Sequence, residues 1–563
     1  MSRETAHEPN HHEPNHHESN HHESNHMVRH DAGVAIVGAG PVGTLLAILL
    51  GNQGKRVILI ERWPTIYDLP RAVTMDHEVA RMLATLGIDC DHDPAFEYHE
   101  ELYYWKNAAL EVLELVDWKS VASSGWRVTY WFNQPELEAR LLGIAGDIPS
   151  VELLRGWEAV SLTQSEETVM LGLRETCGTE GLQKDDERGS EQSTQKTLTA
   201  SYVVGCDGAN SFVREALGIK NVDRGYFFDW LILDMVPNGD YQMVPHQWQL
   251  CDPERPTTLV PGGPGRRRWE FMLLPDECAE TMSKPESAWA LLAPWGLHPG
   301  NSELERSAVY RFQARWAEHW RRGRCLIAGD AAHLMPPFAG AGMCSGLRDA
   351  MGLGWRLNGI LDGLFESEVL ESYVTERMHH ARHFVDFSQR LGDIICISDP
   401  DQAHERDRSM KAALAERNHE PIKVDLVKLG VGLWCENTPD AGQLSTQGIV
   451  EVNGQCGRFD QLVGVGWMVV GFESDPSSVL TECRLDAFRS IGGRTVSIGG
   501  KGMGWDALDV NGTYRSWMNA IDATWFIVRP DFYVAATARS PDQLHRCFDE
   551  IMSKLCITAR VEK

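Results

Sequence analysis

Hydrophobic residues in this chain gather in short runs that end at glycine or at an acidic residue. The first run covers residues 33–37 and leads into Gly38, Gly40 and Gly43, spaced as G-x-G-x-x-G, before a longer apolar segment at 44–54. A short apolar run bounded by glycines is typical of a buried strand, and the longer segment is typical of a helix. The pattern therefore predicts a strand, a tight turn and a helix in succession.

A second apolar run ends in Glu61, which lies 18 residues after Gly43. In such a unit the first glycine makes the tight turn, the second lets the backbone approach a pyrophosphate, and the third packs helix on strand. An acid at the end of the next strand accepts hydrogen bonds from a ribose diol. We therefore expect a dinucleotide site at the three glycines and Glu61, with the adjacent Arg62 as a further cofactor-binding candidate.

A third apolar run, at 325–328, opens the stretch around which the rest of the chain is organised. It leads to Gly329 and Asp330, where glycine has no Cβ to keep the carboxylate from a hydroxyl-rich ligand. A Pro-Pro break follows, and then Gly340-Ala-Gly342 turns into a helix-like segment. Backbone N–H groups of such a turn can bind an electron-rich partner. One end of a bound cofactor is expected here and the other end near residue 40.

The run at 200–205 delivers Asp207 and Gly208 to a strand end in the same way. An ordinary strand–loop–helix connection without a ligand is the alternative interpretation of each acid–glycine pair. Another helix is expected to begin near Gln134, because a proline follows it at the first turn. A helix is also expected to begin near Thr74 or Asp76, either of which can serve as its N-cap.

Changes in composition along the chain indicate its domains. Residues 1–30 repeat paired histidines without apolar periodicity, which predicts a disordered tail that either binds metal weakly or is dispensable. We expect an α/β cofactor-binding domain at 31–398, with a β-rich substrate domain inserted at about 226–306. The charged segment 399–423 is interpreted as a linker, and 424–563 as a separate α/β domain without C-x-x-C, so a redox-active dithiol is not expected there.

Bulk properties narrow the function classes. The formal net charge of −27 over 563 residues argues against nucleic acid or an anionic membrane as partner. The 13 cysteines are scattered without a metal or disulfide pattern, and no run is long enough to span a membrane. A cytoplasmic protein is therefore expected, with no metal site outside the tail, and a homodimer is one assembly that the sequence leaves open.

Three motifs, taken in order, resemble those of class A flavoprotein aromatic hydroxylases. They are GAGPVG at 38–43 with Glu61, CDGANS at 206–211 and GDAAHLMPPFAGAGM at 329–343. Closer similarity to the phenol and phenylpropionate branch is carried by RAVTMDHEV (71–79), RRRWEFMLLPDE (266–277), ESYVTERMHHAR (371–382), GRFDQLVGVGW (457–467) and the segment 509–534, which begins with DVNGTYRSWM and ends with VRPDFYV. The resemblance implies a Rossmann-like FAD-binding domain interleaved with a β-rich substrate domain, followed by a thioredoxin-like C-terminal domain.

The resemblance also implies a reaction. FAD would be reduced by NADH or NADPH, and one atom of O₂ would enter a small phenol ortho to its hydroxyl. The branch suggests 3-(3-hydroxyphenyl)propionate and 3-hydroxycinnamate as substrates. Alternatives are another phenol, a resorcinol or a polyketide, and more remotely a non-catalytic FAD-binding or metal-sequestering protein.

Residue roles follow by similarity to the family. The three glycines of the first turn and Glu61 would hold the ADP half of FAD, Gln134 would lie near the cofactor, and Asp330, with Gly329 before it, would hold the ribityl or pyrophosphate region. Gly342 and Met343 would place N–H groups beside the flavin ring.

Two further motifs carry roles by the same similarity. Asp207 and Gly208 match a motif shared by flavin and nicotinamide phosphates. Pro336 and Pro337 would stiffen the loop that faces the ring and turns at Gly340, where this chain has Gly-Ala-Gly and a relative has Gly-Gln-Gly.

The catalytic base and the substrate's carboxylate partner stay open. A base near the substrate would help to deprotonate the phenol, and Asp76 and His77 are candidates, with helix capping or surface exposure as the alternatives. A substrate carboxylate favours an arginine fork. Arg71, which could instead touch the cofactor or lie free on the surface, and the run 266–268 are the candidates.

Overall fold

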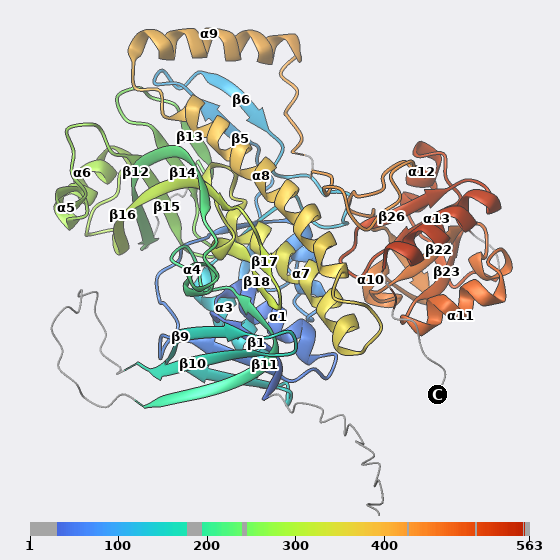
Figure 1. The fold of residues 1–563 in the computed structure, drawn as a ribbon. Coiled ribbons are helices and arrows are strands. Elements are labelled where there is room, and N and C mark those ends of the chain that lie inside the picture. Colours follow the sequence, from blue (N-terminus) through green and yellow to red (C-terminus); the bar gives the residue numbers. More distant parts are fainter. Residues whose placement is uncertain are drawn as a thin grey trace, which may run out of the picture.

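The computed structural model describes residues 31–176, 194–238, 245–424, 427–500, 504–555 and 557. Figure 1 shows three parts: a largely parallel sheet with helices in the lower part of the view, a long-stranded antiparallel sheet above it, and a C-terminal α/β domain to one side. The tail at 1–30, predicted to be disordered, lies outside the described residues.

The first sheet has a parallel core with antiparallel strands attached to it. Its strands are β1 (Ala32–Val37), β2 (Val57–Glu61), β8 (Val151–Arg155), β9 (Trp157–Gln164), β10 (Val169–Glu175), β11 (Gln195–Gly205), β17 (Arg321–Arg322) and β18 (Cys325–Ile327). They run in the order β17-β18-β11-β1-β2-β8, and β10 and β9 extend antiparallel from β11. The apolar runs predicted as strands form β1, β2, β11 and β18, which pair in parallel and are mostly buried because layers cover both faces.

Helices and a small sheet surround this sheet. They are α1 (Pro41–Gly51), α2 (His77–Ala84), α3 (Gln134–Gly146), α4 (Phe212–Ala216), α7 (Gly342–Leu361) and α8 (Val369–Ile395), with β3 (Thr74–Asp76), β4 (Phe96–Glu97) and β7 (Thr129–Phe132). The predicted helices after Gly43, at Gln134 and after Gly342 are confirmed. Helix α1 is apolar on nearly all sides because it packs between the sheet, α3 and α7.

The antiparallel sheet is dominated by two long strands. Its strands are β5 (Tyr103–Lys106), β6 (Val112–Val116), β12 (Asn221–Pro237), β13 (Trp248–Leu250), β14 (Thr257–Pro261), β15 (Arg267–Met272), β16 (Ser302–Ala317) and β19 (His333–Leu334). Short helices α5 (Ala279–Met282) and α6 (Pro285–Leu292) precede β16. The order is β19-β16-β12-β15-β14-β13-β5-β6.

The β-rich layer is larger than the insertion expected at 226–306. Strands β12 and β16 together run from Asn221 to Ala317, and the sheet also includes β5 and β6 from residues 103–116. Sequence patterns could not assign β5 and β6 to this layer, because their pairing depends on contacts with residues far along the chain.

The segment interpreted as a linker, 399–423, is largely helical. Helix α9 covers Pro400–Glu416, and the side chain of Asp399 caps it by accepting a hydrogen bond from the amide of Gln402. Asp-Pro before a helix is a start signal that outweighs the low apolar content of this segment. In Figure 1, α9 lies across the outer edge of the antiparallel sheet, beside β6.

The C-terminal domain has its own mixed sheet and core. Its strands are β20 (Ile449–Val452), β21 (Gln455–Arg458), β22 (Met468–Phe472), β23 (Arg494–Gly499), β24 (Ala507–Asp509), β25 (Trp525–Val528) and β26 (Val534–Ala538). Its helices are α10 (Phe459–Leu462), α11 (Glu482–Ser490), α12 (Thr513–Ala520) and α13 (Pro541–Lys554). The strand order is β21-β20-β24-β23-β22-β25-β26. This confirms an α/β domain, and its thioredoxin-like character stays a prediction.

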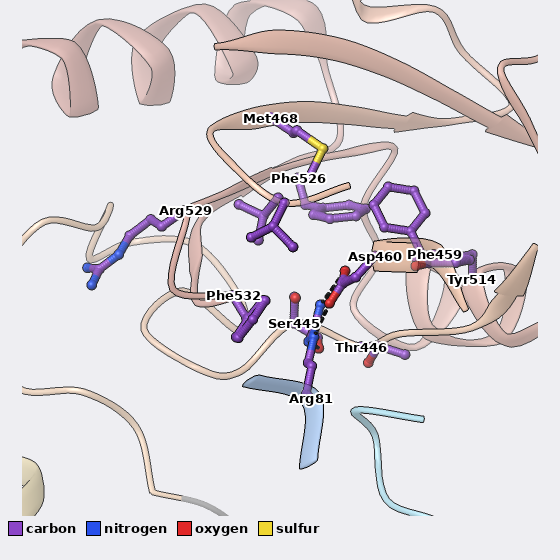
Figure 2. Close-up of a pocket in the computed structure, with 12 residues that line it drawn as sticks. Arg81, Ser445, Thr446, Phe459, Asp460, Met468, Tyr514, Phe526, Arg529 and Phe532 are labelled. Atoms are coloured by element: carbon purple, nitrogen blue, oxygen red, sulfur yellow. Dashed lines mark hydrogen bonds and ion pairs between the residues drawn. The ribbon is translucent and has the colours of Figure 1, made fainter. Parts of the chain in front are cut away.

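Buried charges join the C-terminal domain to the rest of the protein. Arg81 of α2 donates from Nε to Asp460 at 2.6 Å and from Nη1 to the carbonyl of Ser445 at 2.7 Å, as Figure 2 shows. Its guanidinium carbon lies 4.4 Å from the ring centroid of Phe532. The arginine therefore makes an ion pair, a hydrogen bond and a cation–π contact across one interface.

A second buried cluster joins the C-terminal domain to α7 and α8. Arg529 donates to both carboxylate oxygens of Glu376, at 2.8 and 2.9 Å, and Arg356 donates to the same carboxylate at 2.7 Å. Asp531 accepts from Arg529 at 2.6 Å and from the indole N–H of Trp355 at 3.0 Å. Each charge in the cluster is paired, as burial requires.

Neither a membrane-spanning helix nor a metal cluster is found among the residues that the structure describes. Among them, no helix combines the length and the apolar character needed to cross a membrane. No cluster of three or more potential metal ligands occurs in the same part of the chain.

Candidate active site

The first glycine-rich turn has the geometry of a phosphate cradle. Gly38 has φ of +103°, and a Cβ there would lie 2.4 Å from the carbonyl oxygen of Cys206. A Cβ on Gly43 would lie 2.0 Å from the carbonyl oxygen of Gly38, whereas one on Gly40 would meet nothing within 4 Å. The outer two glycines are therefore required by the fold, and the middle one faces open space that a ligand can fill.

Glu61 closes the same turn from the end of β2. Its Oε2 accepts from the amide of Ala39 at 2.9 Å, and its Oε1 accepts from the amide of Trp63 at 3.0 Å. Each carboxylate oxygen keeps a second lone pair for a hydroxyl of a ligand. Arg62 is exposed, with its guanidinium carbon 5.1 Å from the ring centroid of Trp63.

Asp330 follows β18 and is exposed. Gly329 before it adopts φ of +61°, and no hydrogen bond to the Asp330 carboxylate occurs within the described ranges. Desolvation by the surrounding protein raises the pKa of Asp330, and the charges of His333, Arg71 and Arg315 oppose that rise. A carboxylate in this setting suits a ligand that brings hydroxyl groups.

The buried carboxylate of Asp349 fixes the loop that carries Asp330. Asp349 of α7 accepts from the amide of Gly329 at 2.9 Å and from Nε2 of His333 at 2.8 Å. Arg377 of α8 donates to the other oxygen of Asp349 at 2.9 Å. Burial by itself would raise the pKa of Asp349, but His333 and Arg377 hold it below its ordinary value. The loop is therefore held at both of its ends.

The Pro-Pro loop leads to the free N-terminus of α7. Pro336 is buried and Pro337 exposed, and Gly340 turns the chain with φ of +60°. Helix α7 begins at Gly342, and no side-chain hydrogen bond caps it. The amides of Gly342 and Met343 therefore lack intrahelical acceptors, and the helix end carries partial positive charge.

The segment with Asp76 packs against this loop. A Cβ on Gly340 would lie 2.6 Å from Cγ2 of Thr74, so β3 and the loop are in contact. Asp76 caps α2, because its Oδ1 accepts from the amides of Glu78 and Val79 at 3.0 and 3.1 Å. Its other oxygen accepts from Arg348. Burial would raise the pKa of Asp76, but Arg348, His77 and these hydrogen bonds lower it, which favours a structural role over that of a base.

His77 lies away from open space. Its ring is buried, and Nδ1 shares a hydrogen bond of 3.0 Å with Oγ of Ser124. Burial lowers the pKa of His77 to about 4, so the imidazole is neutral at ordinary pH. This environment also favours a structural role.

Gln134 and Arg71 lie together, and the Arg71 charge reaches Asp330. Oε1 of Gln134 accepts from the amides of Arg71 and Ala72, at 3.2 and 2.6 Å. The Arg71 side chain is 53% exposed, and its one ion pair among the described residues, with Glu138, is long at 3.4 Å between nitrogen and oxygen. Arg71 therefore has donors available for a ligand.

The Asp207-Gly208 pair packs against the first turn, because a Cβ on Gly38 would lie 2.9 Å from the backbone nitrogen of Asp207. The Asp207 carboxylate accepts from the hydroxyl of Ser211 and from the amide of Val213 at 3.0 Å, and so holds the start of α4. Burial raises the pKa of Asp207. Gly208 has φ of +79°. Among the described residues, the Asp207 carboxylate contacts groups of its own loop and of α4, which is a structural role.

The arginine run at 266–268 is occupied by protein partners. Arg268 is buried and donates to Asp234 at 2.7 and 3.0 Å and to the carbonyls of Pro70 and Arg71. Arg267 donates to backbone carbonyls at 245–246. Arg266 pairs with glutamates at 136 and 305. These arginines anchor the sheet to the segment that carries Arg71.

An aromatic layer joins the Pro-Pro loop to the antiparallel sheet. The ring centroid of Phe338 lies 5.4 Å from that of Trp230 and 5.7 Å from that of Phe312. Tyr310 packs against the same cluster and hydrogen-bonds with Tyr67. Burial and this neighbour raise the pKa of Tyr67, whose hydroxyl lies beside the Tyr310 ring of the cluster.

Sequence reasoning missed the buried charges that hold these loops. Arg348 and Asp349, like Arg356, are charged residues among the apolar positions of α7, and burial of a charge predicts a partner, so this signal was present in the sequence. The identity of the partners, which include Glu78 and His333, depends on tertiary contacts. Tyr67 and Tyr310 carry no local signal.

Comparison with known proteins identifies the family. A family model described as an FAD binding domain matches residues 31–388, which is more than half of the chain, and the HcaD C-terminal domain model matches residues 442–554. A probable NADH-specific resorcinol 4-hydroxylase of Rhodococcus jostii is 35% identical over 92% of this chain and 94% of its own length. The chain belongs to the class A flavin-dependent aromatic hydroxylases.

Other relatives of this hydroxylase carry the phenylpropionate name. A 3-(3-hydroxy-phenyl)propionate/3-hydroxycinnamic acid hydroxylase of Burkholderia cenocepacia is 31% identical over 90% of this chain and 94% of its own. One from Escherichia coli is 28% identical over 94% and 96%. The hydroxylase is therefore an FAD enzyme that uses a reduced nicotinamide, as the sequence predicted.

Solved structures agree in fold. The flavin-dependent monooxygenase PieE, in complex with FAD and substrate, has a TM-score of 0.77 at 19% identity and covers 93% of this chain and 99% of its own. Aklavinone-11 hydroxylase, with FAD and aklavinone, has a TM-score of 0.72 at 21% identity and covers 94% and 100%. The α/β architecture predicted for the whole chain is thereby confirmed.

Proposed function

We propose that this hydroxylase uses NADH and O₂ to add one oxygen atom ortho to the hydroxyl of a phenol that carries a second substituent in the meta position. The first candidates are 3-(3-hydroxyphenyl)propionate and 3-hydroxycinnamate, and resorcinol is the second. The observation that carries the proposal is the aromatic layer of Phe338, Trp230 and Phe312 beside the free N-terminus of α7. Phe338 packs edge-on against the buried rings of Trp230 and Phe312, so its half-buried ring is held next to the positive helix-end amides.

The first glycine-rich turn, Glu61 and Asp330 fit FAD. In this proposal the cradle at Gly40 and the carboxylate of Glu61 hold the ADP half, because the cradle is open and Glu61 has spare lone pairs. Asp330 holds a hydroxyl-rich part of the cofactor, since its carboxylate lies without a hydrogen bond in the described chain.

The amides of Gly342 and Met343 would face the flavin ring. FAD, when bound, accepts electrons from the nicotinamide and activates O₂. The open amides at the start of α7 stabilise negative charge that develops beside them.

Two side-chain groups orient the phenol in this proposal. Tyr310, within the aromatic layer, accepts or donates a hydrogen bond at the substrate hydroxyl, and Tyr67 supports it. Arg71 receives the carboxylate of a propionate chain, because its guanidinium is 53% exposed and weakly paired. The aromatic surface excludes water from the ring.

Resorcinol is favoured by a different observation. The relative from Rhodococcus jostii at 35% identity carries a resorcinol 4-hydroxylase name, and the arginines at 266–268 are all engaged by the protein itself. Resorcinol has no carboxylate, so it needs no free arginine.

Arg71→Met separates the two substrates. We expect the variant to raise KM for 3-(3-hydroxyphenyl)propionate by at least about tenfold, which corresponds to about 1.4 kcal/mol, while KM for 3-ethylphenol, which lacks the carboxylate, stays unchanged. Substrate-stimulated NADH oxidation with product mass is the measurement. A native enzyme that hydroxylates resorcinol efficiently and leaves the propionate unchanged would establish the second candidate instead.

A further inference from the structure

Two cysteines that lie far apart in sequence meet inside the C-terminal domain. Sγ of Cys435 and Sγ of Cys547, on α13, are 3.4 Å apart, and the two positions are separated by 112 residues. Oε2 of Glu550 lies 3.1 Å from Sγ of Cys435. The sequence predicted no redox-active dithiol because it has no C-x-x-C, but the fold builds a dithiol from distant positions.

We propose that Cys435 and Cys547 form a reversible disulfide when hydrogen peroxide oxidises them. A disulfide has a sulfur–sulfur distance of about 2.0 Å. Small shifts of two side chains would therefore bring the sulfurs into bonding distance. The pair is buried, but the adjacent Glu550 side chain is 40% exposed, so a water-sized oxidant has only a short way to reach it.

The environment distinguishes the roles of the two thiols. The hydrogen bond from Cys435 lowers the pKa of Cys547, and the same bond, burial and Glu550 raise the pKa of Cys435. Cys547 is therefore the sulfur that reacts first with peroxide, because the thiolate is the nucleophile. Cys435 then resolves the product, with Glu550 placed to take its proton.

The steps balance in atoms and electrons. The Cys547 thiolate attacks one peroxide oxygen, the O–O bond breaks, and a sulfenic acid and hydroxide form. Cys435 attacks the Cys547 sulfur, the S–O bond breaks, and the second oxygen leaves as water. Two thiols are oxidised by two electrons in total, and one peroxide is reduced to two waters. Under the proposed function, the enzyme itself would supply peroxide whenever NADH reduces O₂ without ring hydroxylation.

The bond would fix the segment through which the C-terminal domain meets α8. The amide of Cys435 donates to the carbonyl of Ala535 at 2.6 Å, and the amide of Leu433 donates to Glu376 of α8 at 2.6 Å. Oxidation would tie this segment covalently to α13. Closing so long a loop restricts the unfolded chain and raises the unfolding temperature.

The test treats the purified full-length protein with hydrogen peroxide and then compares intact mass, peptide maps and unfolding temperature with and without a thiol reductant. We expect the mass to fall by two hydrogen atoms at this pair, a linked peptide pair that contains Cys435 and Cys547, a higher unfolding temperature, and full reversal by reductant. The test requires no hydroxylase activity, so its outcome is independent of the substrate.

Control variants assign the bond. Cys435→Ser and Cys547→Ser should each abolish the linked peptides, whereas Cys456→Ser, at an exposed cysteine, should leave them unchanged. The proposal is overturned if both thiols of the native protein remain open to alkylation after unfolding while exposed Cys483 has been oxidised. Separate oxidation of each thiol to a sulfinic acid would also overturn it. Both readouts come from the native protein and do not depend on the folding of a variant.

Discussion

The carboxylate of Asp349 accepts a hydrogen bond from the backbone amide of Gly329, with 2.9 Å between N and Oδ2. The same oxygen accepts from Nε2 of His333 at 2.8 Å. These two donors flank Asp330, so one buried carboxylate on α7 fixes both ends of the loop that carries the exposed Asp330. The apolar helix and the cofactor loop are thereby one structural unit.

Replacing Asp349 with asparagine should damage both stability and FAD retention. The change leaves Arg377 buried without its counter-charge, which costs roughly 3–5 kcal/mol of unfolding free energy. Denaturant unfolding and the flavin content after gel filtration are the measurements. The control is Asp362→Asn, which breaks a partly exposed pair with Lys55 and should cost about 0–1 kcal/mol. Equal effects of the two variants would contradict the role of Asp349.

Substitutions at Gly40 and at Gly43 of the first turn should have different effects. Gly40→Ala adds a methyl group to open space at φ of −72°, so apoprotein stability should change by less than about 0.5 kcal/mol while FAD affinity falls. Gly43→Ala would place Cβ 2.0 Å from a carbonyl oxygen and should destabilise the fold by at least about 1–3 kcal/mol. FAD titration and thermal unfolding separate the two. Full FAD affinity in Gly40→Ala would rule out a pyrophosphate at this turn.

His77 should make the protein sensitive to acid. Burial lowers its pKa from 6.5 to about 4, so between these values the unfolded chain binds a proton that the folded protein does not. Its contribution is therefore complete above pH 6.5 and falls by about 3 kcal/mol as the pH drops toward 4. His77→Asn should flatten the dependence of unfolding free energy on pH over this window.

A matched variant controls for histidine loss in general. The side chain of His92 is 81% exposed, so His92→Asn should leave the pH dependence as in the native protein. Urea unfolding at several values across the window gives the comparison. A native protein whose unfolding free energy is constant there would show that His77 is not held neutral by the fold.

The C-terminal domain should depend on Arg81. Arg81→Met leaves the Asp460 carboxylate buried without its charged partner and should cost roughly 3–5 kcal/mol. The control, Arg484→Met, removes a partly exposed pair with Asp549 and should cost about 0–1 kcal/mol. Proteolysis after the 399–423 segment should accelerate only in the first variant. Unchanged stability would mean that the interface is held by its apolar contacts.

Local patterns were sufficient for the elements around the first turn. The apolar run before Gly38, the helix after Gly43 and the acid at Glu61 are close in sequence, so strand, turn and helix could be predicted with their ligand chemistry. Asp330 followed from the same logic. The exposure of Asp330 and the lack of a hydrogen bond to its carboxylate among the described residues agree with that hypothesis.

Non-local contacts account for what the sequence did not reveal. Strand β5 joins the antiparallel sheet through β13, about 140 residues later, and no periodicity records such a pairing. Asp76 and His77 were considered as bases because of their motif, yet their partners Arg348 and Ser124 are supplied by distant segments. The Cys435–Cys547 contact arises in the same way.

The most direct test of the central claim is a turnover experiment with isotopically labelled O₂. The purified FAD-loaded protein would be mixed with NADH and 3-(3-hydroxyphenyl)propionate, with resorcinol in parallel, and the product would be examined by mass spectrometry. The account predicts substrate-stimulated NADH oxidation and a catechol that carries one labelled oxygen ortho to the original hydroxyl. NADH oxidation that yields only peroxide with every meta-substituted phenol would contradict it.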